Sequence, residues 1–269
     1  MRVLFNSFSA FLRVAIATMM QYRGEIFLWA VWGLINPAVL YAMWSAAAEG
    51  NVDQTLAGFD RGQFGAYYFC IMIIGHVTTA WDAYELGYFI RSGSLSPKLL
   101  RPILPVWEAL AANIAYKVAT LAFVVPSWLI FYLIVRPTFS AGLWQISLGL
   151  LAVVLAGVLN FVIGYVVALV AFWSPKLDAV GEAYFGMAMM FGGRFAPLEA
   201  LPWLLKEIAL VLPFRWMYAF PAELLMGKIA TASEALAGIG MQLVWLAAFV
   251  LAFRVGWAAA VKRYTAVSG

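Results

Sequence analysis

Two polar side chains lie inside stretches of the sequence that are otherwise apolar. His76 lies well inside a run that begins near residue 64, and Asn160 lies near the middle of a later run. A polar group inside a membrane is costly to bury, so each is a candidate for function. His76 could line a pore or relay protons, or it could be a neutral imidazole bonded to a neighbouring helix. Asn160 could contact a substrate, or it could hydrogen-bond across helices.

Two charged residues bracket a short, glycine-containing apolar stretch farther along the chain. Glu182 and Arg194 are about twelve residues apart, so they cannot pair within one straight helix. We expect each to lie at its own interface, with an aqueous cavity as the alternative environment of Arg194. The centres of the apolar stretches contain no carboxylate that could form an ion relay.

Motifs for covalent, metal or nucleotide chemistry are absent from the sequence. It contains no G-x-S-x-G, no H-E-x-x-H and no P-loop. The only Gly-Lys pair, Gly227-Lys228, has Ala222 where a P-loop requires its first glycine. Cys70 is the single cysteine and His76 the single histidine, which excludes an internal disulfide and a standard zinc site. We therefore expect no catalytic residue, metal or cofactor on this chain, and any chemical energy must come from another chain.

The composition identifies an integral membrane protein. Of the residues, 65% are hydrophobic and only 11% are charged, against about 25% charged residues in soluble domains. Such a chain has too little polar surface to cover a water-soluble globule, so lipid must be its solvent. The net charge of +4 is explained by positively charged cytoplasmic loops rather than by a nucleic-acid partner.

Apolar stretches suited to crossing a membrane recur six times, which predicts an all-α integral membrane protein with six transmembrane helices. The expected spans are about 26–48, 64–81, 118–135, 143–173, 179–196, and from a capping box at Thr231 and Glu234 to about 260. Between the second and third spans we expect a polar loop and then a separate interfacial segment that ends near Lys117.

The start of the chain, up to Tyr22, predicts an N-terminal amphipathic helix on the membrane surface. Its polar residues Arg2, Asn6, Ser9 and Arg13 recur at helical spacing and so share one face. The alternative is a signal peptide, but Arg13 interrupts the apolar core that such a peptide requires.

A proline-rich stretch separates the fifth and sixth spans. No single straight helix fits residues 197–229, because Pro197, Pro202, Pro213 and Pro221 interrupt it. We expect two short helices separated at Pro213-Phe214, which are external and re-entrant or lie on the bilayer. Pro202 suits a helix start, and Pro213 and Gly227 suit helix ends.

Positive charge predicts the orientation. With six crossings, eleven of the 17 Lys and Arg residues lie on the side of the N-terminus and six on the other side. Because cytoplasmic loops carry the excess of Lys and Arg, we expect the N- and C-termini to be cytoplasmic.

Two sequence motifs identify a family. The first is IRSGSLSPKLLRP at residues 90–102; the second combines GG at 192–193, PLEALP at 197–202, LPFR at 212–215 and FPAELLMG at 220–227. In this order, and with six spans, the chain resembles the permease subunits of ATP-binding cassette transporters of the type-2, exporter-like class, and most closely a bacterial branch of them. The resemblance covers essentially the whole chain.

The resemblance implies an assembly and a division of this chain. Two permease subunits, the same or paralogous chains, form the membrane unit, and cytosolic ABC ATPase subunits bind ATP and Mg. Residues 1–25 would be the connecting helix and residues 26–269 a single transmembrane domain in the cytoplasmic (inner) membrane. The loop at about 85–105 would be the coupling element that docks on the ATPase, through residues Arg91, Gly93, Leu95, Leu99, Leu100 and Arg101.

The resemblance also implies that the external hairpin at about 197–231 caps a translocation path. The residues that we expect in the path or at its external gate are His76, Asn160, Arg194, Pro197, Pro202, Pro213, Phe214 and Arg215. Arg194 departs from the family pattern, which has an uncharged residue at this place. It could line a basic vestibule or pair with a partner chain.

The expected function is that of a permease subunit of an ATP-driven exporter, which moves a small amphipathic or hydrophobic substrate by alternating access. The alternative is an ATP-independent secondary transporter or channel. A third possibility, a membrane scaffold without a transport role, leaves the broken stretch after the fifth span without a purpose.

Overall fold

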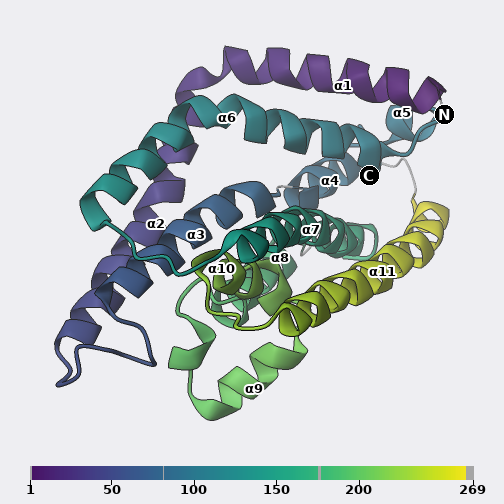
Figure 1. Cartoon of the computed structure of the whole chain (residues 1–269). Helices are drawn as coiled ribbons and strands as arrows, with labels where there is room; N and C mark the ends of the chain where they lie inside the picture. The colour runs from purple at the N-terminus through teal and green to yellow at the C-terminus, as the bar shows by residue number, and fades with distance from the viewer. Residues whose placement is uncertain (1, 81, 175–176, 265–269) are drawn as a thin grey trace.

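The computed structural model describes residues 2–80, 82–174 and 177–264, and this part of the chain is helical without a β-strand (Figure 1). The α-helices and the single-turn 3-10 helices (η) are α1 (Arg2–Gln21), α2 (Arg23–Glu49), α3 (Arg61–Thr78), α4 (Asp82–Arg91), α5 (Ser96–Leu99), α6 (Pro105–Val135), α7 (Leu143–Ala168), η1 (Leu169–Phe172), α8 (Leu177–Phe191), η2 (Leu198–Ala200), α9 (Trp203–Val211), η3 (Arg215–Met217), α10 (Ala219–Met226) and α11 (Ala232–Arg263).

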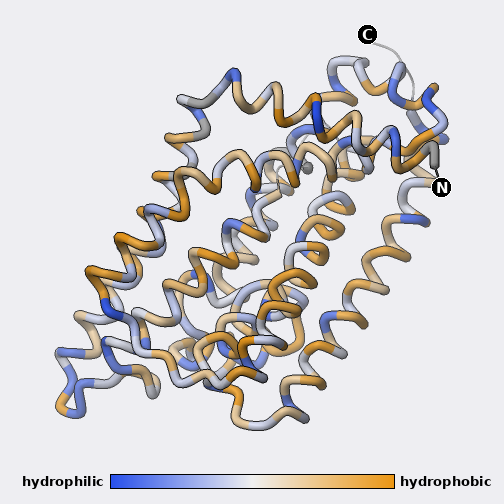
Figure 2. Tube along the Cα trace, turned by 45° about the horizontal axis from the view of Figure 1, so that its top comes forward, coloured by the Kyte–Doolittle hydropathy of each residue, from blue (hydrophilic) through white to orange (hydrophobic). Residues whose placement is uncertain are grey.

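Four helical segments in the described part of the chain are long and apolar enough to cross a membrane. They are Phe27–Glu49, Pro105–Val135, Leu143–Phe172 and Ala232–Arg263. Figure 2 shows hydrophobic residues along most of the length of these helices, with hydrophilic residues concentrated toward the ends of the molecule. The chain is therefore a multi-pass membrane protein.

The expected second and fifth spans are both helices, but α3 begins earlier than predicted and α8 is shorter than predicted. α3 has 18 residues and ends at Thr78; the predicted end at Trp81 lies outside the described residues. α8 has 15 residues and ends at Phe191 instead of 196. It ends there because Gly193 has a φ of +83°, a left-handed conformation that turns the chain away from the helix axis.

The expectation of a separate interfacial segment ending near Lys117 is wrong, because α6 runs without a break from Pro105 to Val135. In Figure 1 its first turns lie beside α1 and its later turns beside α2, with which it also packs. The polar residues do not end the helix, since they have a partner in the backbone directly after α3. Asn113 Nδ2 and Lys117 Nζ both donate to the carbonyl oxygen of Thr79, at 3.0 and 2.8 Å.

The proline-rich stretch contains two short helices, α9 and α10, separated by residues 212–218, as the sequence predicted. α9 begins directly after Pro202 and ends before Pro213. α10 ends at Met226, directly before Gly227, whose φ is +88°. Of the predicted capping box of α11, one hydrogen bond is shown: the Thr231 hydroxyl accepts from the Glu234 amide at 3.3 Å.

The largest buried cluster surrounds α3, which packs against α2, α6, α7 and α10. Phe64, Tyr67, Tyr68 and Ile74 on this helix are fully buried. Burying a large apolar side chain stabilises the fold by about 1.5–3 kcal/mol. α3 is therefore the central helix, and its two ends lead to the loops at opposite ends of the molecule.

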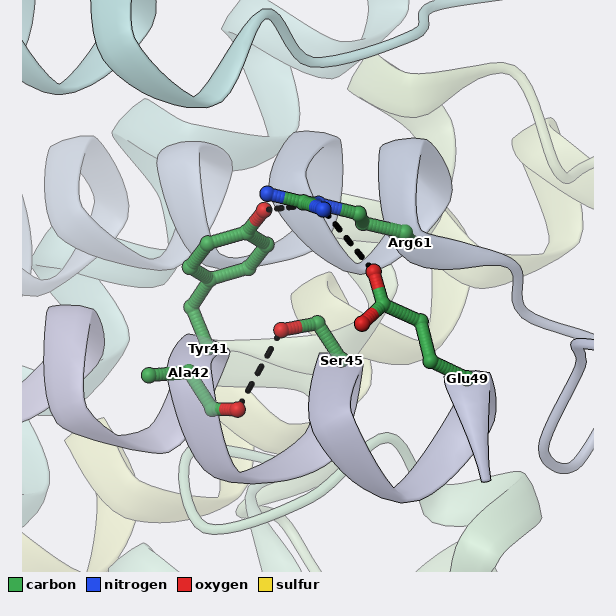
Figure 3. Close-up of polar contacts among 5 residues, drawn as sticks. All are labelled: Tyr41, Ala42, Ser45, Glu49 and Arg61. Carbon is green, nitrogen blue, oxygen red and sulfur yellow. Dashed lines mark hydrogen bonds and ion pairs between the residues drawn. The ribbon is translucent and has the colours of Figure 1, made fainter. Parts of the chain in front are cut away.

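An exposed polar contact joins the end of α2 to the start of α3 (Figure 3). Arg61 Nη1 lies 2.9 Å from Glu49 Oε1, and Arg61 Nε donates to Tyr41 Oη at 3.4 Å. Nearby, the Ser45 hydroxyl donates to the Ala42 carbonyl oxygen at 3.2 Å. Both charged side chains are at least half exposed, so water screens the ion pair and it contributes little to stability.

Candidate functional site

A cavity of about 430 Å³ lies among α2, α3, α6, α7 and α8. Three of the residues predicted for the translocation path line it: His76, Asn160 and Arg194. Its volume is in the range of sites that hold small molecules, about 300–1,000 Å³. The fold thus brings together three polar residues that are far apart in the sequence.

Aromatic side chains form much of the cavity wall. Trp29 and Trp32 come from α2, Trp128 from α6, and Tyr184 and Phe185 from α8. Sequence reasoning missed these as site residues, because aromatic residues in apolar helices are equally common in ordinary packing. The sequence carries no signal that separates the two uses.

His76 is bonded to a neighbouring helix and also faces the cavity. Its Nε2 atom lies 3.2 Å from the carbonyl oxygen of Lys117 on α6, and its ring makes an edge contact with Trp128, with centroids 5.5 Å apart. Of the two interpretations of His76, a pore-lining or proton-relay group and a neutral imidazole bonded to a neighbouring helix, this geometry fits the second. The cavity position keeps its ring within reach of a ligand.

Asn160 connects three helices at the edge of the cavity. Its Nδ2 atom donates to the carbonyl oxygen of Thr78, at the end of α3, and its Oδ1 atom accepts from the Tyr184 hydroxyl on α8. Asn113 and Lys117 bind the next carbonyl group, that of Thr79. The last carbonyl groups of α3 therefore have partners from α6 and α7, which fixes this helix end to its neighbours.

Glu182 and Arg194 lie toward opposite ends of the cavity wall formed by α8 and the turn after it. The carboxylate Oε1 of Glu182 accepts a hydrogen bond from the Tyr84 hydroxyl on α4 at 3.1 Å. The guanidinium of Arg194 lies over the rings of Phe185 and Tyr218, at 5.4 and 5.1 Å from their centroids. Tyr84 was not predicted as a site residue, and only the packing of α4 on α8 reveals it.

The other predicted gate residues lie outside the cavity wall. Pro197, Pro213 and Phe214 are buried, and Pro202 is exposed at the start of α9. Phe214 packs on Tyr184, with ring centroids 5.9 Å apart, and so supports the wall from behind. Arg215 forms an ion pair with Glu223 on α10, with Nη2 and Oε2 3.0 Å apart.

The six residues predicted for ATPase coupling lie on α4, on α5 and in the turns beside α5, but they differ in exposure. Gly93 has a φ of +72° and turns the chain between the two helices. Leu95 is fully buried in a cluster with Leu86, and Leu99 is partly buried against the same cluster. Leu100 is 88% exposed. Of the three leucines predicted for ATPase coupling, only Leu100 projects from the surface.

The positive charges beside this loop are held in place. Lys98 Nζ and Arg101 Nη1 both bind the carboxylate of Glu108 on α6, at 2.6 and 3.0 Å. The side chain of Arg91 on α4 is exposed. Glu85 lines a small cavity beside Lys98 and Glu108. Loss of hydration there raises the pKa of the Glu85 carboxyl above its ordinary value; Lys98 lowers that pKa and Glu108 raises it.

The end of α11 is joined to the same loop. The Tyr264 hydroxyl lies 2.9 Å from the Ser96 hydroxyl and donates to the Gly93 carbonyl oxygen at 3.4 Å. The Tyr264 ring packs on Phe172, with centroids 6.1 Å apart. Hence the loop is fixed to α11 and η1 as well as to α6.

A comparison with family models identifies the chain. Residues 34–268 match the model described as "ABC-2 family transporter protein". This range contains the cavity residues His76, Asn160 and Arg194 and the loop with Leu100. Searches of curated proteins and of solved structures give no match. The family model covers far more than half of the chain, so the protein belongs to the ABC-2 transporter family and is a permease component of an ABC transporter.

Proposed function

We propose that this chain is the permease subunit of an ATP-driven exporter that moves a small amphipathic or hydrophobic substrate across the membrane by alternating access. The observation that carries the proposal is the position of α3. This helix lines the cavity with His76 and Gly75 and ends directly before the loop formed by α4 and α5. A single element thus connects the candidate substrate site to the candidate ATPase contact.

The contacts of α4 suggest how movement of the loop would reach the cavity. α4 packs against α7 and α8, and its Tyr84 hydroxyl is bonded to Glu182 on α8. When ATP closes the partner ATPase subunits, the exposed Leu100 and Arg91 are pushed with the loop. The displacement passes from α4 to α8, and also to the end of α3 that is bonded to α6 and α7. The cavity then changes between inward-open and outward-open states.

The proposed topology has six crossings. α3 and α8 complete the four long spans, and α9 and α10 form the re-entrant external hairpin. In Figure 1 the start of α1, α5 and the end of α11 lie at one end of the molecule, with α9 at the other, as an even number of crossings requires. The positive charges assign the first end to the cytoplasm, with α1 as the connecting helix on the surface of the bacterial inner membrane.

The chain acts with partners that supply what it lacks. A cytosolic ABC ATPase subunit binds ATP and Mg and docks at Leu100 and Arg91. A second permease subunit, identical or paralogous, completes the path, and lipid surrounds the exposed apolar helix faces. Nucleic acid has no part in this function, and the permease itself catalyses no reaction.

A second candidate function is ATP-independent transport coupled to protons. His76 and Glu182 are titratable groups on the cavity wall, which favours it. The partners of these groups argue against it, because His76 Nε2 contacts the Lys117 carbonyl oxygen and the Glu182 carboxylate already accepts from Tyr84.

The proposed function predicts a stable complex with an ATPase. A tagged form of the chain is purified from its native membrane in mild detergent. We expect it to carry a P-loop ATPase chain, identified by mass spectrometry, together with vanadate-sensitive ATP hydrolysis. A membrane protein of similar abundance with the same tag serves as the control. Recovery of the permease without any P-loop ATPase would contradict the proposal.

A further inference from the structure

The described wall of the cavity carries two formally charged side chains, and only one has an oppositely charged or hydrogen-bonded partner. Glu182 accepts from Tyr84. Arg194 forms no ion pair within the described residues. The Glu182 carboxylate is therefore not the counter-ion of Arg194, although the guanidinium reaches back along α8 to the ring of Phe185.

The backbone on both sides of Arg194 is held by hydrogen bonds from three helices. Tyr67 on α3 donates to the Gly193 carbonyl oxygen at 2.7 Å. The Phe195 carbonyl oxygen accepts from Tyr68 Oη at 2.8 Å and from Trp44 Nε1 on α2 at 2.9 Å. The turn also binds α10 through the Ala219 amide and the Gly192 carbonyl oxygen, at 3.0 Å. The backbone position from which the Arg194 side chain extends is therefore fixed.

Close packing around Gly193 leaves no room for a side chain at this position of the turn. A Cβ atom at Gly193 would lie 2.5 Å from the Tyr67 hydroxyl oxygen and 2.8 Å from Ala219 Cβ. The positive φ of Gly193 also disfavours any other residue. Two neighbouring helices thus contact the backbone directly, and the turn cannot move without them.

The guanidinium itself is positioned by aromatic faces. Phe185 and Tyr218 both lie within 5.4 Å of it, and such cation–π contacts stabilise the charge without using the N–H groups in its plane. Those groups match a carboxylate or a phosphate in a two-point contact. A charge without a counter-ion beside a membrane cavity is costly, and an anion in the cavity removes that cost.

We propose that Arg194 binds the anionic group of the substrate, a carboxylate or phosphate on an amphipathic molecule whose apolar part lies against Trp29, Trp32 and Trp128. The proposal rests on the cavity being the substrate site of the proposed exporter. It narrows the substrate class to anionic amphiphiles. The anion can belong to a soluble compound or to a lipid headgroup, and the chemistry at Arg194 is the same.

Binding to the full-length protein in neutral phosphatidylcholine nanodiscs tests this directly. The probes are dansyl-aminohexanoic acid, its methyl ester and the corresponding dansyl amine, detected by energy transfer from the cavity tryptophans. We expect the acid to bind about tenfold more tightly than the ester, a difference of about 1.4 kcal/mol, because only the carboxylate accepts charged hydrogen bonds from Arg194. The amine should bind no more tightly than the ester.

Variants assign the preference to the arginine. Arg194→Gln should remove the preference for the acid but leave ester binding unchanged, which also verifies that the variant is folded. Arg194→Lys should retain part of the preference. Arg136→Gln is the matched control, because Arg136 is exposed and lies outside the cavity wall. Equal binding of acid and ester by the wild-type protein would overturn the proposal, and so would an unchanged preference in Arg194→Gln.

A competition arm identifies the source of the anion. Displacement of the bound acid by short-chain phosphatidic acid, but not by the matching diacylglycerol, supports a lipid phosphate at Arg194. Displacement by aromatic carboxylates alone supports a soluble substrate. None of these measurements uses ATP or the ATPase, so a failure of ATP-driven transport leaves this result standing, and the reverse also holds.

Discussion

Replacing Leu100 with aspartate should reduce ATP-driven transport at least tenfold while the permease still folds and inserts. Leu100 is 88% exposed beside α5 and is the projecting leucine of the loop that we assign to the ATPase contact. Burial of such a side chain in a partner contributes about 1.5–3 kcal/mol, and a carboxylate in its place adds a desolvation cost. The measurement is the amount of ATPase that co-purifies, together with uptake into proteoliposomes.

The matched control is Val52→Asp. Val52 is also fully exposed, but it lies in the α2–α3 loop at the opposite end of the molecule (Figure 1). We expect this variant to keep both the ATPase and transport. If Leu100→Asp transports as well as Val52→Asp does, the loop around α5 does not couple this permease to ATP.

Replacing Arg215 with methionine should destabilise the permease by about 3–5 kcal/mol. The Glu223 side chain is only 7% exposed, and its Oε2 atom lies 3.0 Å from Arg215 Nη2. Removing one partner leaves a buried charge without compensation, whereas removing both does not. The double variant Arg215→Met/Glu223→Leu should therefore recover most of the lost stability, measured by thermal unfolding in one detergent.

The exposed pair at the α2–α3 junction serves as the control for this experiment. Arg61→Met removes an ion pair whose two side chains are at least half exposed (Figure 3), so we expect a much smaller loss of stability than in Arg215→Met. Equal losses in Arg61→Met and Arg215→Met would refute a structural role for the Arg215–Glu223 pair. Arg215 would then again be a candidate for direct contact with the substrate.

Local signals in the sequence predicted local structure well. Pro202 and Gly227 mark the start of α9 and the end of α10, and Thr231 caps α11. These features depend on the conformation of one or two residues, which the residue type largely determines. The four long apolar segments also follow from composition alone.

Features that depend on partners distant in sequence were not predictable. The sequence suggested an interfacial segment before Lys117, yet α6 is continuous because Lys117 finds the Thr79 carbonyl group directly after α3. Leu95 and Leu100 have the same side chain in the same loop, but one is buried against Leu86 and the other is exposed. Only the packing of the loop distinguishes them.

The candidate site likewise has residues that the sequence predicted and residues that it did not predict. His76, Asn160 and Arg194 were identified because a polar residue in an apolar segment is conspicuous, and all three line one cavity. The aromatic wall with Trp29 and Trp128 was not identified, because a single sequence does not reveal which face of a helix meets the cavity. The turn that fixes Arg194 involves three helices and has no local signal beyond its two glycines.

Transport into proteoliposomes is the most direct test of the claim that ATP hydrolysis by the partner ATPase drives transport through this permease. The permease and its ATPase are reconstituted together, and entry of the dansyl acid, ester and amine is followed by fluorescence. We predict uptake of at least one probe with Mg-ATP, and none with a non-hydrolysable analogue or with a proton or sodium gradient alone. Uptake driven by an ion gradient in vesicles that contain the permease without the ATPase would contradict the account.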